Sequence, residues 1–218
     1  MITVCTMLWD ANPQSYSFSR CYTEEWVEKL HAGFRRNLTV PMRFVCFTDR
    51  PRQFSAGIDT QWIEGEPSYA SCIEPYKLDE PMIVVGLDTI VVGNCDHLAA
   101  YAIGGKKLAA PRDPMFPDKV CNGVVLAPKG GAEVWRIFKS GSDLEHIREM
   151  WKRGDVAVID DIFPGQVVSY KGKVRADGLT DDTRIVYFHG RNKPHELTHV
   201  GWIARHWRAD DIKKERAA

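Results

Sequence analysis

The stretch MIVVGLDTIVVGNCD, residues 82–96, contains two apolar runs with a single carboxylate between them. The first run, Met82–Val85, is rich in β-branched residues and predicts a buried strand. Asp88 follows it closely, and the second run, Thr89–Val92, predicts a strand that ends in a turn. In open α/β sheets, ligands bind beyond the carboxyl ends of the strands, which is where Asp88 would lie. We therefore expect Asp88 to bind a metal or a ligand, with turn capping as the structural alternative.

The composition is that of an ordinary globular protein that can bury one sizeable core. The chain has 218 residues, of which 44% are hydrophobic and 27% charged, and its formal net charge is zero. We expect a single domain over residues 1–218, with a C-terminal tail, about residues 202–218, as a candidate separate packing element. Neutrality removes the electrostatic argument for a nucleic-acid-binding domain, although it leaves room for a local basic patch.

Cysteine usage and the first residues of the sequence bear on localisation. The start, MITVCTMLWD, has neither a basic region nor a long apolar stretch, so we do not expect a secretory signal peptide. The six cysteines show no CxxC spacing, and most lie in or beside apolar runs, where a reduced thiol is the usual state. We expect a cytoplasmic protein with no membrane span.

The order of the expected elements is typical of an α/β fold. A strand at Ile2–Leu8, a helix from Thr23 to Asn37 and a strand at Arg43–Phe47 form a βαβ unit, so the two strands should be parallel. The pattern of Ser71–Leu78 allows a short helix, but Pro75 would break it, so this segment is left unassigned. The other elements predicted by the pattern are strands at residues 58–63, 107–110, 120–127, 167–170 and 184–188, and helices at residues 132–139 and 143–153.

A second polar cluster follows the last predicted strand, at His189–Pro194, HGRNKP. Carboxylate and imidazole suit a divalent transition ion that keeps positions open for phosphate oxygens, so Asp88 and His189 are candidate ligands. Gly190 would let backbone N–H groups approach an anion, and Lys193 would act on that anion as a point charge. Taken singly, a hydrogen-bonded structural histidine and a solvated lysine are the alternatives.

In combination, these residues resemble a known family. The chain looks like the GT-A-fold glycosyltransferases related to family 8, in particular a compact bacterial and phage group, whose motifs include LDxDxVVxGxxD and a late HGxxKPW. The resemblance covers about residues 2–200. The matching stretches, in the order of the family, are VGLDTIVVGNCD (85–96), RDP (112–114), NGVVL (122–126), FPGQVVSYK (163–171) and FHGRNKP (188–194).

The resemblance implies a single GT-A-like domain with a mixed, mostly parallel sheet flanked by helices. It implies a hexosyltransferase that moves a sugar from a nucleotide-diphospho-sugar, with UDP as the expected nucleotide, to a hydroxyl acceptor with retention of configuration. Mn²⁺ or Mg²⁺ would be held by Asp88 and His189, and Lys193 with the Gly190 backbone would stabilise the leaving β-phosphate. The catalytic residues would be Asp88, Lys193 and Asp155. The other donor-binding residues would be Thr6, Leu8, Trp9, Asp49, Arg112, Asp113, Asn122 and Gly123.

The sequence departs from the family pattern at three positions. Gly86 stands where the family has the first acid of its pair, and His195 stands where it has an aromatic residue. Val156 replaces a glutamine that the resemblance would place near the reacting carbon. The main alternative is therefore a degenerate GT-A domain that binds a nucleotide or sugar without transferring it. Three carboxylates are acceptor-side candidates, with helix or turn capping as the alternative for each: Asp155, Asp160 and Asp161.

The sequence leaves the acceptor open among a glycan, a small molecule and a hydroxylated base in phage DNA. A basic and aromatic tail would suit the DNA acceptor, and a solvated C-terminal end is the alternative for it. The residues of that tail are Arg205, His206, Trp207, Arg208, Lys213, Lys214 and Arg216.

Overall fold

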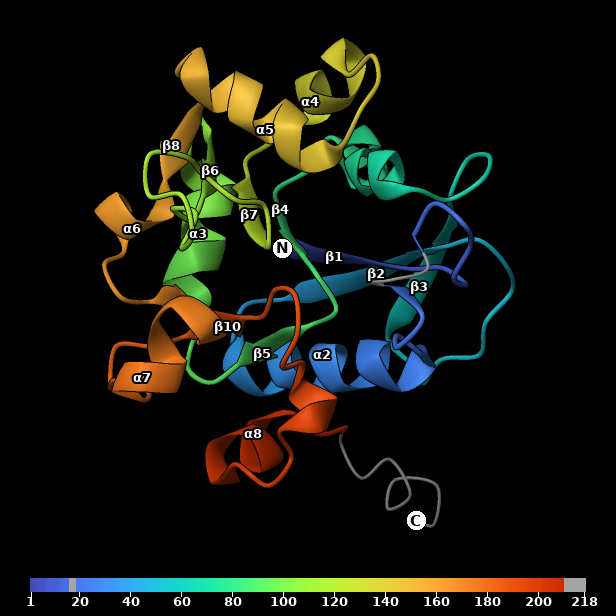
Figure 1. Ribbon diagram of the computed structural model, residues 1–218. Helices are drawn as coiled ribbons and strands as arrows, with labels where there is room; N and C mark the ends of the chain where they lie inside the picture. The colour runs from blue at the N-terminus through green and yellow to red at the C-terminus, as the bar shows by residue number, and fades with distance from the viewer. Residues whose placement is uncertain (16–18, 210–218) are drawn as a thin grey trace.

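The computed structural model describes residues 1–15 and 19–209, and a seven-stranded sheet runs through its centre (Figure 1). The strand order is β3-β2-β1-β4-β7-β6-β8. All strands of this sheet run in one direction except β7, which is antiparallel to both of its neighbours. The expected α/β fold with a mixed, mostly parallel sheet is confirmed. The strands are β1 (Ile2–Leu8), β2 (Met42–Thr48), β3 (Ile58–Trp62), β4 (Met82–Val85), β6 (Leu108–Ala110), β7 (Val124–Ala127) and β8 (Val156–Val158).

A smaller sheet of order β5-β10-β9 packs beside the first, with strands β5 (Thr89–Val91), β9 (Val167–Ser169) and β10 (Ile185–Tyr187). β10 is antiparallel to β5 and parallel to β9. The stretch of residues 82–96 therefore supplies a strand to each sheet, as its two apolar runs predict. Asp88 lies between the two strands, where the chain passes from one sheet to the other.

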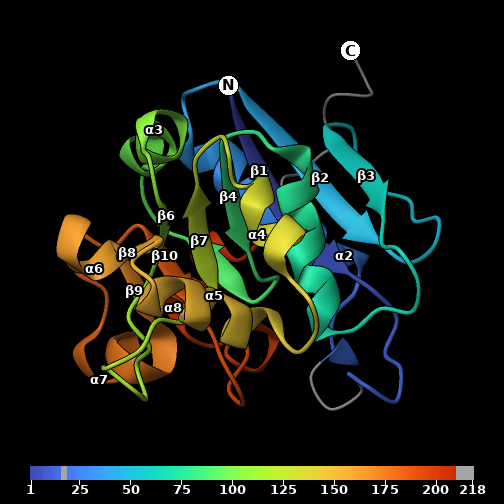
Figure 2. The ribbon, with the colours of Figure 1, turned by 90° about the horizontal axis from the view of Figure 1, so that it is seen from above.

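Helices cover both faces of the main sheet. The helical elements are α2 (Glu24–Asn37), η1 (Tyr69–Leu78), α3 (Asp96–Gly104), α4 (Ala132–Ile137), α5 (Asp143–Lys152), α6 (Ile159–Ile162), η2 (Tyr170–Val174), α7 (Arg175–Asp177), η3 (Pro194–Glu196) and α8 (Gly201–His206). In Figure 1, α4 and α5 lie above the sheet and α2 and α8 below it, and Figure 2 shows α4 and α5 in front of β4 and β7. No helix within residues 1–15 and 19–209 has the length and apolar composition needed to cross a membrane.

The alternation of side chains along the strands divides the core in two. Val4 and Phe44 pack with α2, α3 and the small sheet, whereas Cys5 and Val45 pack with η1, α4 and α5. Successive strand residues face opposite sides of a sheet, so both faces must be apolar when helices cover both. This explains why the central strands read as continuous apolar runs.

The expected βαβ unit is confirmed, since β1 and β2 are parallel and α2 connects them. The apolar face predicted for α2 is buried, including Trp26 and Phe34. The segment before β4, which the sequence left unassigned, is the 3₁₀ helix η1, and it contains Pro75. The tail from His195 onward contains α8, in line with the short helix or turn that its sequence predicts.

The pattern over residues 120–127 predicts a strand interrupted by a turn or bulge at Asn122 and Gly123. The strand β7 begins after this interruption, at Val124, and Asn122 and Gly123 line a cavity. Ser142 caps α5 by accepting a hydrogen bond from the Glu145 N–H at 3.2 Å, and the Glu145 side chain binds Arg148.

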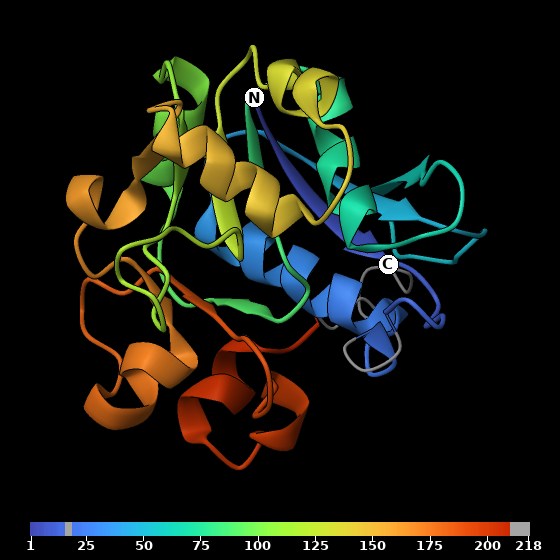
Figure 3. The same ribbon diagram turned by 45° about the horizontal axis from the view of Figure 1, so that its top comes forward.

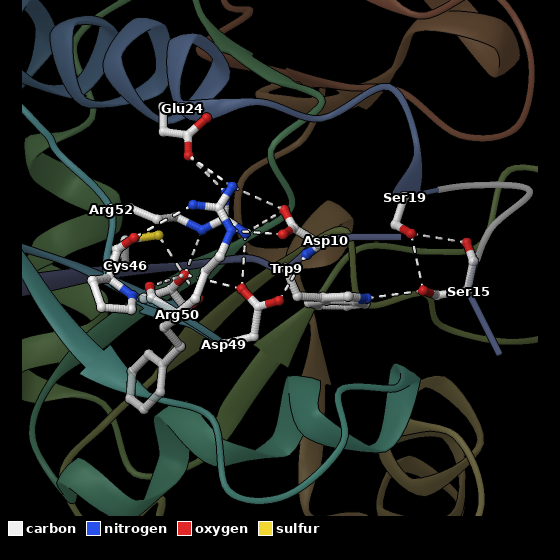
Figure 4. Close-up of polar contacts among 12 residues, drawn as sticks. Trp9, Asp10, Ser15, Ser19, Glu24, Cys46, Asp49, Arg50 and Arg52 are labelled. Atoms are coloured by element: carbon white, nitrogen blue, oxygen red, sulfur yellow. Dashed lines mark hydrogen bonds and ion pairs between the residues drawn. The ribbon is translucent and has the colours of Figure 1, made fainter. Parts of the chain in front are cut away.

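An ion-pair cluster fixes the ends of β1 and β2 against the start of α2 (Figure 4). The Arg52 guanidinium, whose side chain is 2% exposed, donates to Asp10 (2.8 Å), Asp49 (2.8 Å) and Glu24 (2.7 Å). Burial alone would lower the pKa of Arg52, yet its three carboxylate partners raise it. Arg50 binds Asp10 from the solvent side at 2.6 Å and is 47% exposed. Arg52 is thus the buried centre of the cluster and Arg50 its outer member.

Replacing the two arginines should separate these roles. Arg52→Met leaves three carboxylates without their shared buried cation and should lower the free energy of unfolding by about 3 kcal/mol. Arg50→Met removes an exposed ion pair and should lower the free energy of unfolding clearly less than Arg52→Met does. Urea unfolding followed by tryptophan fluorescence measures both values. Equal losses for the two variants would show that the buried position of Arg52 carries no special weight.

Candidate functional site

A cavity of about 660 Å³ opens at the carboxyl ends of β1, β4 and β10. Residues 7–9, 84–88 and 187–190 line it where these strands end. Because β7 runs against its neighbours, its beginning reaches the same edge and adds Asn122 and Gly123 to the wall. Most of the wall is aliphatic or aromatic, and the polar side chains gather in a few places. This is the position at which open α/β sheets bind ligands.

The first group of polar side chains in the cavity is an ion pair between Asp88 and Lys193. The Lys193 ammonium donates to the Asp88 carboxylate, which also accepts a hydrogen bond of 3.2 Å from the Tyr22 hydroxyl. The side chains of Lys193 and Asp88 are only 10% and 13% exposed. Gly86 leaves room for the carboxylate, since a Cβ there would lie 3.0 Å from Asp88 Oδ1. The lone acid of residues 82–96 is therefore paired, as burial requires.

The segment that carries Lys193 folds back over the cavity through Gly190, whose φ is +63°. The left-handed region favours glycine, so a side chain here would strain the turn. The Lys171 ammonium lies 3.3 Å from the place of a Cβ on Gly190, which brings a second cation to the turn. The Lys193 N–H is held by the Glu196 carboxylate at 2.8 Å. Two ammonium groups thus flank a tight backbone turn at one end of the cavity.

His189 lines the cavity as expected, but its ring does not point to Asp88. His189 Nε2 and Ser169 Oγ lie 2.9 Å apart. Burial lowers the pKa of His189, and the charges of Lys171 and Lys193 lower it further. At neutral pH the ring is therefore a neutral hydrogen-bonding group next to two cations.

The arrangement around Asp88 does not fit the divalent ion expected from the sequence. Asp88 already holds Lys193 and Tyr22, and His189 faces Ser169. In the part of the chain that the structure describes, no group of three or more His, Cys, Asp and Glu side chains is placed to hold a metal. Binding of Mn²⁺ or Mg²⁺ by Asp88 and His189 stays a prediction, and no step below depends on it.

A further polar place, which the sequence did not reveal as a site, is centred on Asp143 at the start of α5. Asn122 donates to its carboxylate, and the Cys72 thiol from η1 donates as well. Burial raises the pKa of Asp143 to about 6, although these hydrogen bonds and that of the Leu144 N–H favour the ionised form. The sequence does contain a pattern that indicates this position. At helical spacing, Asp143 lies on the same face of α5 as the buried residues Ile147 and Met150.

The structure brings most of the sequence-predicted site residues to this cavity. Asp113 lines it, but its carboxylate is occupied by Arg148 at 2.7 Å and by the backbone N–H groups of Met115 and Phe116. It holds the loop at the mouth of the cavity rather than facing a ligand. The predicted residues that line the cavity are Leu8, Trp9, Asp88, Asp113, Asn122, Gly123, His189, Gly190 and Lys193.

Four predicted site residues, Thr6, Asp49, Arg112 and Asp155, lie outside the cavity lining. The Thr6 hydroxyl donates to the Val85 carbonyl between β1 and β4 at 3.0 Å. Asp49 is held by Arg52 in the cluster described above. Arg112 binds Asp161 at 2.7 Å. Asp155 pairs with Arg153 at 3.4 Å on the surface.

The structure also shows where the predicted acceptor-side residues and the tail residues lie. Asp160 accepts the backbone N–H of Arg112 at 2.7 Å, so it holds a loop, as does Asp161 through its pair with Arg112. Of the tail residues proposed for DNA, Trp207 is buried against Trp26, with ring centroids 4.9 Å apart. Lys213, Lys214 and Arg216 lie outside the described residues.

No protein-family model matches the sequence, and no curated protein is significantly similar to it. The assignment of a function therefore depends on the motifs and on this geometry.

The Asp143 carboxyl should make folding stability depend on pH. Its folded pKa of about 6 lies above the ~3.9 of an aspartate in an unfolded chain, so the folded state binds the proton more tightly. Its stabilising contribution is complete below about pH 4 and is lost as the pH rises through about 6. Relative to Asp143→Asn, wild type should lose on the order of 3 kcal/mol over this window, because about two pKa units at ~1.4 kcal/mol each are involved.

Urea unfolding of wild type and Asp143→Asn between pH 3.5 and about 7.5 measures this difference. Asp118→Asn, at an exposed position, serves as the matched control. Parallel stability curves for wild type and Asp143→Asn would contradict a buried carboxyl at this position.

Proposed function

We propose that this protein is a glycosyltransferase that uses a nucleotide-diphospho-sugar donor, with UDP as the expected nucleotide. The observation that carries the proposal is the Lys193–Asp88 pair beside the Gly190 turn, inside a cavity at the carboxyl edge of the sheet. The same residues belong to the two stretches that most resemble the glycosyltransferase motifs, FHGRNKP and VGLDTIVVGNCD.

The cationic end of the cavity suits a diphosphate. Lys193 supplies a positive charge that is largely withdrawn from water, and Lys171 adds another beside Gly190. When a donor enters, its β-phosphate replaces Asp88 as the partner of Lys193. As the bond between the sugar carbon and the phosphate oxygen breaks, negative charge grows on that oxygen, and a fixed ammonium stabilises it.

The neighbouring wall suits a planar base. Trp9 and Tyr69 lie edge to face with ring centroids 6.5 Å apart, and Tyr22 completes an aromatic surface next to Asp88. The Trp9 ring is fixed by its N–H bond of 2.9 Å to Ser15. Aromatic rings offer stacking or edge contacts to a base without a charge requirement.

The transfer itself exchanges one bond for another. The acceptor oxygen bonds to the sugar carbon while the bond from that carbon to the phosphate oxygen breaks, and the acceptor proton passes to the departing diphosphate. Retention of configuration, assistance by Mn²⁺ and a DNA base as acceptor stay predictions.

Nucleotide binding is the first test. Wild type should bind UDP and UDP-glucose by calorimetry, and Lys193→Gln should weaken both at least tenfold, because it removes the ammonium that meets the diphosphate. Lys152→Gln, on the exposed side of α5, should leave both dissociation constants unchanged. Each titration is run with EDTA and with Mn²⁺, which tests the metal prediction separately. Absence of UDP binding in both conditions would overturn the proposal.

Turnover distinguishes an enzyme from a domain that only binds, the alternative that Gly86 and Val156 suggest. Release of UDP from a UDP-sugar, with water or an added acceptor, should fall at least 100-fold in Lys193→Gln, because this variant lacks the ammonium that stabilises the charge on the departing phosphate oxygen. His199→Ala, at an exposed position, should match wild type. A chain that binds UDP-sugars tightly while releasing UDP no faster than buffer alone would be a binding domain.

A further inference from the structure

The part of the cavity formed by η1 and α5 is not used by the diphosphate chemistry above. Asp143, Asn122 and Cys72 line it together with Tyr76. This part belongs to the same cavity as Lys193, although η1 and α5 pack on the other face of the sheet. In Figure 3, α5 lies above α2 and the C-terminal segment with α8 lies below it. A ligand that fills the cavity would contact both Lys193 and Asp143.

The chemistry of this end excludes a phosphate. Asp143 presents a carboxylate at neutral pH, because its pKa of about 6 leaves it ionised there. The carboxylate repels anions but accepts hydrogen bonds from hydroxyl groups. Its Asn122 partner is an amide, which can both donate and accept. The Cys72 thiol is a weak donor that a ligand hydroxyl can replace at little cost.

The surroundings suit a sugar ring. Tyr76, Ile73 and Leu144 place aromatic and aliphatic surface around the polar pair. A pyranose carries hydroxyl groups on its rim and C–H groups on its faces, so it needs both a polar pair and an apolar surface. The 660 Å³ of the whole cavity falls within the ~300–1,000 Å³ typical of small-molecule sites.

We propose that Asp143 and Asn122 form the subsite that binds the hydroxyl groups of the sugar carried by the donor, and that they select which sugar is accepted. This inference rests on the proposed function, because it needs a nucleotide sugar whose diphosphate lies at Lys193. It adds Asp143 of α5 to the site and keeps Asn122 from the donor-binding residues Arg112, Asp113, Asn122 and Gly123 that the sequence resemblance implies. Of these, Arg112 lies outside the lining and Asp113 is occupied.

The test compares the binding of a nucleotide with and without its sugar. Calorimetry gives dissociation constants for UDP, UDP-glucose, UDP-galactose and UDP-N-acetylglucosamine, with EDTA or Mn²⁺, whichever gives the tighter UDP complex. Hydrogen bonds to a charged group contribute about 1.5–3 kcal/mol. Asp143→Ala should therefore weaken the best UDP-sugar at least tenfold while changing UDP itself less than twofold.

Two further variants guard against a trivial loss of folding. Asn122→Ala removes the other half of the pair without touching α5 and should weaken the same sugar selectively. Glu149→Gln changes an exposed acid on the same helix and should leave every constant unchanged. Because UDP binding is measured on each variant, a misfolded protein is recognised by the loss of UDP as well.

The outcomes separate the two proposals. If wild type binds no UDP compound, the proposed function fails. If UDP and UDP-sugars bind but Asp143→Ala and Asn122→Ala leave the ratio of their dissociation constants unchanged, the sugar subsite is wrong and the proposed function stands. Equal dissociation constants of wild type for UDP and all three UDP-sugars would also overturn the subsite.

Discussion

The ion pair between Lys193 and Asp88 holds the cavity together, because it joins the crossing between the two sheets to the segment after β10. Neither charge could stay in so enclosed a position alone, since an unpaired buried charge costs several kcal/mol. Backbone hydrogen bonds join the same two segments. The Phe188 N–H donates to the Asp88 carbonyl at 3.0 Å, and β5 pairs with β10. The pair therefore closes one wall of the cavity in the absence of any ligand.

The direction of β7 is the second constraint on the site. A strand parallel to β4 would begin at the opposite edge of the sheet and leave this wall without Asn122. The antiparallel strand instead starts beside Gly86, whose N–H donates to the Gly123 carbonyl at 3.1 Å. Gly123 fits because a Cβ there would come within 3.1 Å of the Tyr187 ring. The asparagine that binds Asp143 is thus positioned by sheet topology.

Features that depend on local pattern could be predicted from the sequence, and those that depend on distant partners could not. Apolar runs gave the strands, and a lone acid between two runs placed Asp88 at a strand end. The sequence could not show that Arg112 and Asp49 lie outside the cavity lining, because their partners, Asp161 and Arg52, meet them only when the loops are folded together. Asp143 was missed because an acid in the first turn of a helix is ordinary, and only the tertiary structure shows that its carboxyl faces a cavity.

The two polar places in the cavity differ in what they can do for a reaction. In the reaction that we propose, Asp143 and Asn122 would meet hydroxyl groups, whose charge does not change during transfer, so they would contribute equally to substrate and transition state. Lys193 would meet an oxygen whose charge grows as the bond breaks, so its contribution would increase along the reaction. In the resting protein Asp88 compensates Lys193 and lowers the cost of burying an ammonium there. Gly86 stands where the motif that this sequence resembles has a second carboxylate, which would compete with the proposed diphosphate for that ammonium. Lys193 is thus held near one carboxylate that a diphosphate, with its larger charge, can replace.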